Sequence, residues 1–347
     1  MTTDLLTSIE GRVGRIRLNR PKAIHALNLA MCVAILDALE AWRTDPAVEA
    51  ILIDHAEGRG FCAGGDIRML ADSGALDGRE AREFFFTEYR MNHRLFTYAK
   101  PVVAFMDGIT MGGGVGLSMP AKFRVATENT RFAMPETGIG LLPDVGGGWY
   151  LSRLSGRMGE YIAVTGARLD GADCVALGLS THYLAAESLD AAKARIAAEP
   201  QRIADILDEL AAPAPRAAIL PERARIDRLF KSDQLEEVIA ALEADDSEWA
   251  AKTLEMVKGK SPLSCKIALK LVGDGRYMPS FEDEMRQEYA VASRVVQRHD
   301  FLEGVRAVIV DKDHAPKWNP ATPEGVTGHV IEQIFAPLPD SEAWTPA

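Results

Sequence analysis

Two carboxylates that stand eight residues apart, Glu136 and Asp144, are the side chains of this sequence best placed to do chemistry. The stretch that carries them, residues 132–148, holds too much glycine and proline for one helix and too little alternation for a strand. We interpret it as a rigid, closely packed turn that presents both acids to one small space. Glu136 follows Pro135 among apolar neighbours, so burial should raise its pKa and suit it to proton transfer.

Each of these acids also has a purely structural interpretation. Asp144 precedes a Val-Gly-Gly-Gly run that leads into a helical pattern, so it is a fair helix cap. Glu136 is open to being a buried glutamate held by main-chain donors. Glu88 lies in an amphipathic helical pattern, and its local sequence indicates nothing more than an exposed helix residue.

Two glycine-rich turns precede the acidic one, at residues 61–66 and 108–116. Each follows an apolar, strand-like run and leads into a helical pattern, so unpaired main-chain N–H groups are expected at the helix start. Two such turns face to face can direct two donors at one oxygen, which is an oxyanion hole. The expected donors are Gly65 and Gly113, with Asp66 capping the next helix. One turn alone favours a tight-turn role, but three together favour an active site.

The composition indicates a soluble, cytoplasmic protein. No apolar run is long enough for a membrane span, the first residues lack the pattern of a signal or transit peptide, and four scattered cysteines suit a reducing compartment. A net charge of −11 argues against nucleic-acid or membrane surfaces as partners. The seven histidines have no metal-ligand spacing, so we expect no metal. An anionic ligand would need a local basic patch, for which the candidates are Arg15, Arg17, Arg20 and Lys22.

The elements that must position these turns alternate between strand and helix, which predicts an α/β fold. The predicted strands cover residues 13–18, 50–54, 101–106 and 123–127, and the predicted helices cover 28–44 and 79–98. After about residue 187, alanine-rich helical segments dominate, with a further helix at 281–296 and an extended tail from residue 316. We therefore expect a core over residues 1–186 and a helical C-terminal region over 187–347.

The three turns, taken with the strand at 123–128, resemble the enoyl-CoA hydratase/isomerase (crotonase) superfamily. A distal block at residues 299–313 and 316–318 resembles its 3-hydroxyisobutyryl-CoA hydrolases in particular. The resemblance spans residues 10 to 320 and implies a spiral of ββα units with C-terminal helices that close an acyl-CoA site. It further implies a thioester carbonyl held by Gly65 and Gly113. It leaves the oligomeric state open between a homo-oligomer, either a trimer or one built from trimers, and a chain whose helical appendage occupies the trimer face instead. It implies no cofactor, since coenzyme A arrives as part of the substrate. The positions that match coenzyme A contacts are Lys22, Ala23, Ala63, Asp66 and Ile67.

The resemblance also separates two activities. Hydratases of the superfamily use two glutamates, of which the first falls at Gly116 here and the second at Glu136. Asp144 matches the hydrolase pattern, and Glu88 matches a substrate-pocket glutamate of the hydrolases. The expected activity is hydrolysis of a short 3-hydroxyacyl-CoA thioester, such as 3-hydroxyisobutyryl-CoA in valine breakdown. The alternatives are an enoyl-CoA hydratase or isomerase, and a non-catalytic acyl-CoA or RNA binder, which the retained acids and the negative charge disfavour.

Overall fold

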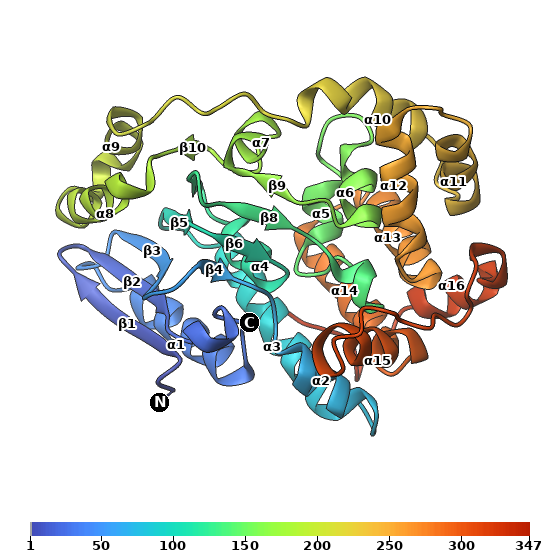
Figure 1. The fold of residues 1–347 in the computed structure, drawn as a ribbon. Helices are drawn as coiled ribbons and strands as arrows, with labels where there is room; N and C mark the ends of the chain where they lie inside the picture. Colours follow the sequence, from blue (N-terminus) through green and yellow to red (C-terminus); the bar gives the residue numbers. More distant parts are fainter. Residues whose placement is uncertain (1) are drawn as a thin grey trace.

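The computed structural model describes residues 2–347 and contains two sheets built mainly from parallel strands (Figure 1). The six-stranded sheet has the order β1 (Leu5–Glu10), β2 (Val13–Leu18), β3 (Ala50–His55), β5 (Val102–Met106), β7 (Phe123–Ala126) and β10 (His182–Tyr183). The four-stranded sheet has the order β4 (Gly60–Cys62), β6 (Ile109–Met111), β8 (Arg131–Ala133) and β9 (Leu169–Asp170). The pairs β3/β4, β5/β6 and β7/β8 each place one strand in each sheet and then enter a helical segment. This repetition confirms the predicted spiral of ββα units.

Burial explains which strands lie at the centre of the larger sheet. Strands β3 and β5 are parallel neighbours, with Ile51 opposite Val102 and Ile53 opposite Ala104, and their apolar side chains are buried. Continuous apolar runs of this kind are typical of parallel strands that are covered on both faces. The glycine-rich turns follow β4 and β6, so the smaller sheet brings them side by side.

Two long helices, α1 (Leu29–Arg43) and α3 (Arg79–Phe96), pack against each other beside the sheets. Helix α1 begins where its N-cap Asn28 accepts a hydrogen bond of 2.9 Å from the Met31 N–H. Its buried residues include Ile35 and Leu39, at the helical spacing that the sequence showed. The predictions for 28–44 and 79–98 are thus confirmed to within two residues at each end.

The helical region after residue 187 has two parts. Helices α8 (Leu189–Ala198) and α9 (Ile203–Glu209) share a hydrophobic cluster with the six-stranded sheet, in which Ile196 and Ile206 join Leu52 and Phe105. Most of the following helices gather at the opposite end of the molecule (Figure 1): α10 (Arg223–Leu229), α11 (Leu235–Glu243), α12 (Glu248–Lys258), α13 (Pro262–Gly275), α14 (Phe281–Val295), α15 (His299–Val305) and α16 (Gly328–Phe335). The boundary proposed at residue 186 stays a prediction.

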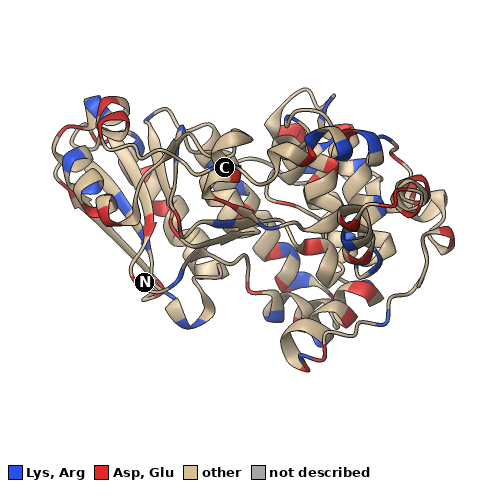
Figure 2. Cartoon of the chain, turned by 45° about the horizontal axis from the view of Figure 1, so that its top comes forward, with Lys and Arg blue, Asp and Glu red and all other residues tan. Residues whose placement is uncertain are grey.

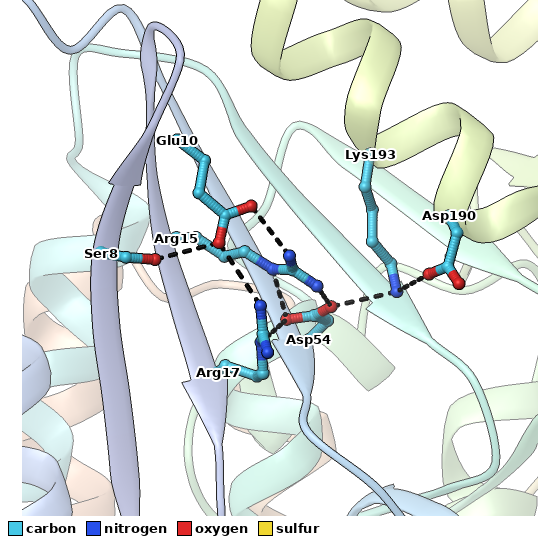
Figure 3. A network of polar contacts seen from close by, with 7 residues as sticks. All are labelled: Ser8, Glu10, Arg15, Arg17, Asp54, Asp190 and Lys193. Carbon is cyan, nitrogen blue, oxygen red and sulfur yellow. Dashed lines mark hydrogen bonds and ion pairs between the residues drawn. The ribbon is translucent and has the colours of Figure 1, made fainter.

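A polar network ties α8 to the strands (Figure 3). Asp54 is 2% exposed and accepts two hydrogen bonds from the Arg15 guanidinium, at 2.6 and 3.2 Å, while Lys193 of α8 lies 3.0 Å away. Arg15 and Arg17 also pair with Glu10. The prediction that these two arginines belong to an anion-binding patch is therefore wrong, because carboxylates already neutralise both of them.

The C-terminal segment differs from the extended tail that its prolines predicted. Helix α16 forms because Thr327 caps it, accepting a hydrogen bond from the Val330 N–H, and because Ile334 is buried. Further on, the buried Trp344 donates its indole N–H to the Phe86 carbonyl oxygen at 3.1 Å, which docks the chain end on α3.

Charged residues of both signs are interspersed along the ribbons (Figure 2). Short-range pairs such as Lys252 with Glu248 and Arg286 with Glu282 account for part of this mixing on the C-terminal helices. Among the helices of residues 2–347, none combines the length and the apolar character that crossing a bilayer requires.

Candidate active site

The three turns singled out from the sequence line one cavity of about 460 Å³. The first turn contributes Gly65 and the second contributes Gly113, while the acidic turn contributes Glu136 and Asp144. Helix α3 adds Glu88 to the same wall. Residues from four separate parts of the chain thus meet in one space, and three of them are acids.

The two glycine turns lie directly against each other. Gly64 has a φ of +121° and Gly112 a φ of +48°, and a Cβ added at Gly112 would lie 3.1 Å from the Cα of Gly64. Only glycine allows this approach together with these backbone angles. Gly113 opens α4 (Gly113–Ser118), so its N–H belongs to the first helical turn, and within residues 2–347 the Gly65 N–H donates no hydrogen bond. Both amides are therefore suited to an external oxygen.

Glu136 begins the short 3-10 helix η2 (Glu136–Ile139) and is 5% exposed. A Cβ added at Gly112 would lie 3.3 Å from its Oε1, so the carboxyl group lies against the second glycine turn. Its Oε2 has no hydrogen-bond partner among the described residues. Burial raises the pKa of Glu136 well above its usual range, the nearby charge of Asp144 raises it further, and Lys260 opposes the rise.

Asp144 is held by α3. Its Oδ2 accepts a hydrogen bond of 2.7 Å from the phenol of Tyr89. Burial raises the pKa of Asp144 to about 6, and the bond from Tyr89 limits the rise. Asp144 is not the cap that its position suggested, since the N-cap of α5 (Gly147–Leu151) is Gly146. It is a buried acid whose carboxylate faces the cavity.

Glu88 is also buried, which its local sequence did not indicate. The side chain is 2% exposed, and a Cβ added at Gly113 would lie 2.8 Å from its Oε1. Burial raises the pKa of Glu88 well above its usual range, and the charge of Asp144 adds to this. The expectation of an exposed helix residue is wrong, because α3 turns this face towards the second glycine turn.

Gly116 has no room for a side chain. A Cβ at this position would lie 2.6 Å from the Nδ2 of Asn92 and 2.8 Å from the Cβ of Val145. Asn92 lies one helical turn beyond Glu88 and is fully buried. The place at which the resemblance puts the first of the two hydratase glutamates is therefore filled by other side chains.

Of the five residues predicted to contact coenzyme A, two line the cavity and three do not. Ala63 and Ile67 line the cavity. Asp66 caps α2 (Ile67–Gly74), accepting a hydrogen bond of 3.3 Å from the Met69 N–H, and pairs with Arg20 at 2.8 Å. Its capping role was predicted from the sequence and is confirmed.

Lys22 and Ala23 lie in the 3-10 helix η1 (Pro21–Ala23), which is adjacent to the first glycine turn through a hydrogen bond of 2.9 Å from the Ala63 N–H to the Ile24 carbonyl oxygen. Lys22 is exposed, and neither residue lines the cavity. Their contact with coenzyme A stays a prediction.

The positive charge at the cavity comes from residues that the sequence did not single out. Arg168 and Lys260 line it, as does His314 from the segment after α15. A Cβ added at Gly138 would lie 3.2 Å from the Lys260 Nζ, and burial lowers the pKa of Lys260. Lys260 stands 124 positions beyond Glu136, so no local pattern could have joined them.

Comparisons with known proteins agree with this geometry. The model of the enoyl-CoA hydratase/isomerase family matches residues 13–335. The chain is 43% identical to the mitochondrial 3-hydroxyisobutyryl-CoA hydrolase of Xenopus laevis (94% of this chain, 87% of the relative), and 40% identical to the human protein of the same name (98% and 90%).

Two solved structures are similar over nearly their full length. A carnitinyl-CoA dehydratase from Mycobacterium thermoresistibile has a TM-score of 0.94 at 40% identity, covering 98% of both chains. An enoyl-CoA hydratase from Rhodobacter sphaeroides has a TM-score of 0.89 at 38% identity, covering 99% of this chain and 100% of the other. The vertebrate relatives are named as mitochondrial proteins, and this overturns the expectation of a cytoplasmic location.

Proposed function

Because the chain belongs to the enoyl-CoA hydratase/isomerase family, we propose that it hydrolyses the thioester of a short 3-hydroxyacyl-CoA, with 3-hydroxyisobutyryl-CoA as the substrate. The observation that carries the proposal is the carboxylate of Asp144, which Tyr89 holds in a cavity that also contains Glu136 and Glu88. A carboxylate at this place can accept a hydrogen bond from a 3-hydroxyl group. The proposed reaction needs no cofactor, and the family implies a homo-oligomer built from trimers.

The thioester carbonyl would lie between the amides of Gly65 and Gly113. As water attacks, negative charge develops on the carbonyl oxygen, and two fixed N–H donors stabilise that charge more than they stabilise the ground state. The close approach of the two glycine turns supports this role, since Gly65 and Gly113 both line the cavity.

Glu136 would move the proton. Its raised pKa suits it to take a proton from the attacking water and to give it to the departing sulfur when the C–S bond breaks. A second route is direct attack of the Glu136 carboxylate on the thioester carbonyl carbon, which breaks the C–S bond, releases the coenzyme A thiolate and gives an anhydride that water then opens. One turnover in heavy-oxygen water separates these routes, since label on the Glu136 carboxyl group would favour the anhydride.

The first test is release of free thiol from 3-hydroxyisobutyryl-CoA. Glu136→Gln should lower kcat by at least about 100-fold, the lower end of what general acid–base catalysis contributes, while binding of the CoA ester stays close to that of the wild type. Glu255→Gln, on the exposed face of α12, is the matched control and should retain full activity. Most of the activity surviving in Glu136→Gln would remove Glu136 from the mechanism.

Hydration or dehydration is the second candidate, and the names of the two solved structures favour it. The crowding around Gly116 disfavours it, because Asn92 and Val145 leave no space for a second acid there. An assay with crotonoyl-CoA decides between the activities: the hydrolase proposal expects little or no loss of the enoyl double bond. Tight binding of either ester without turnover would instead indicate a non-catalytic acyl-CoA binder.

A further inference from the structure

The turn that carries Asp144 contains a residue in an unfavourable backbone conformation. Val145 has a φ of +56°. A β-branched side chain rarely adopts this left-handed region, and such a residue persists only where its surroundings hold it in place. Val145 separates Asp144 from Gly146, so whatever holds Val145 also sets the direction of the Asp144 side chain.

A buried glutamate from α14 binds the residues just beyond the strained position. The Gly146 N–H donates to Oε2 of Glu288 at 2.7 Å, and the Gly148 N–H donates to Oε1 at 3.1 Å. These amides belong to the start of α5, whose N-cap Gly146 offers no side chain. Glu288 is fully buried. It provides the side-chain cap that Gly146 lacks, although it stands 140 residues beyond Gly148 in the sequence.

A second glutamate accompanies the first. Glu284 lies one helical turn before Glu288 on α14 and is also fully buried. Neither of the carboxyl oxygens of Glu284 has a hydrogen-bond partner among the described residues. An ionised carboxylate without donors is strongly disfavoured in such a place, and burial raises the pKa of Glu284 to about 8. Like charges on Glu284 and Glu288 disfavour each other, so the pair favours having one of its two carboxyl groups neutral.

Other titratable groups face this pair from the surrounding elements. Asp144, Tyr89 and Tyr150 act on Glu288. Arg153 and Asp274 act on Glu284. Burial and the negative neighbours raise the pKa of Glu288, while its two main-chain bonds favour the ionised form. The Gly146 and Gly148 amides are the donors that the Glu288 carboxyl group has in this place.

We propose that Glu288 is a positioning residue that fixes Asp144 for catalysis by binding the amides on the far side of Val145. This role rests on the proposed function and adds to the catalytic machinery a residue that touches no substrate. Simple core packing is a poor explanation for the pair, since two apolar side chains of similar size would fill the space without desolvating two acids. A carboxylate at this position accepts hydrogen bonds from the Gly146 and Gly148 N–H groups, and an apolar residue could not accept them.

The test compares Glu288→Gln with the wild type in two ways. An amide side chain can accept from only one of the two N–H groups, so hydrogen exchange of at least one of the Gly146 and Gly148 amides should become about 10-fold faster or more. Turnover of 3-hydroxyisobutyryl-CoA should fall by about 10- to 100-fold in kcat, the effect of misplacing a reacting group by about 1 Å, while KM changes by less than about threefold. KM should be spared because Glu288 does not line the cavity.

Two further variants sharpen the result. Glu284→Gln should keep the slow exchange of both amides, since both of them are bound by Glu288 and neither by Glu284. Glu160→Gln is the control for a buried glutamate that does not line the cavity: Glu160 is fully buried and pairs with Arg157 and Arg276. It should lower the melting temperature and leave kcat unchanged. If Glu288→Gln does not fold, Glu288→Asp keeps the charge with a shorter reach and should show the same split between kcat and KM.

Wild-type exchange rates and wild-type kcat in the folded Glu288 variant would overturn the proposal. So would equal loss of kcat in Glu160→Gln, because the effect would then follow stability alone. The exchange measurement does not depend on the substrate. A wild-type protein that releases no thiol from 3-hydroxyisobutyryl-CoA would therefore refute the proposed function and still leave the role of Glu288 decided by exchange.

Discussion

Replacing Tyr89 with phenylalanine should shift the pH dependence of catalysis. The phenol of Tyr89 donates to the Asp144 carboxylate at 2.7 Å, and both groups are buried. The bond favours the ionised form of Asp144 and so holds its pKa down to about 6 against the effect of burial. Tyr89→Phe removes the donor and almost none of the packing, so the pKa of Asp144 should rise.

The size of the shift follows from the strength of the bond. A hydrogen bond to a charged group contributes about 1.5–3 kcal/mol, and one pKa unit corresponds to about 1.4 kcal/mol, so the pKa should rise by about one to two units. With a pKa of about 6, about nine-tenths of Asp144 is ionised at pH 7. In the variant this fraction should lie between about one half and one tenth.

The assay is kcat/KM for thiol release between pH 5 and pH 10. In Tyr89→Phe the acidic limb of the profile should move up by about one to two units, and the activity should approach that of the wild type above about pH 9, where Asp144 is again ionised. Tyr98→Phe is the matched control, since its phenol donates to the Leu39 carbonyl oxygen away from the cavity. An unshifted limb, or an equal loss of activity at every pH, would refute the reasoning.

Two further predictions concern stability. The pKa of Asp144 is raised on folding, from 3.8 to about 6, so its contribution to stability is fully present below pH 3.8 and is lost as the pH rises through 6. Between pH 5 and pH 8, urea unfolding should show the wild type losing about 1.4 kcal/mol that Asp144→Asn retains, and equal pH dependence would contradict this. Asp54→Asn should lower the free energy of unfolding by about 3–5 kcal/mol, because Arg15 and Lys193 lose their buried partner. KM should not change in Asp54→Asn, and a shifted KM would indicate that the network in Figure 3 reaches the active site.

Local sequence patterns predicted the elements whose formation depends on near neighbours. Strand β2 and helix α14 appear within one residue of their expected bounds, because alternation and helical spacing record burial directly. The three functional turns were also predictable, since glycine and proline constrain the backbone wherever they stand. Asp66 is an example: a capping residue acts on an amide three positions away, and the structure shows that contact.

Contacts between distant parts of the chain were not predictable in this way. Tyr89 meets Asp144 across 55 positions and Glu288 meets Gly146 across 142, and nothing in the sequence near either residue indicates its partner. The burial of Glu88 has the same cause, since it depends on how α3 meets the second glycine turn. The helix α16 escaped notice because prolines on both sides masked a short capped segment.

The arrangement of acids bears on why hydrolysis fits this cavity better than hydration. Adding water across a double bond in this superfamily uses two glutamates, and the crowding at Gly116 leaves Glu136 without the first of them. Hydrolysis can use one carboxyl group twice, since the proton taken from water is the proton that the departing sulfur needs. A single buried group with a raised pKa meets both demands, and the charge of Lys260 favours its ionised form. Asp144 is then free to bind a hydroxyl group of the acyl chain, which is the feature that would distinguish a 3-hydroxyacyl ester from an unsubstituted one.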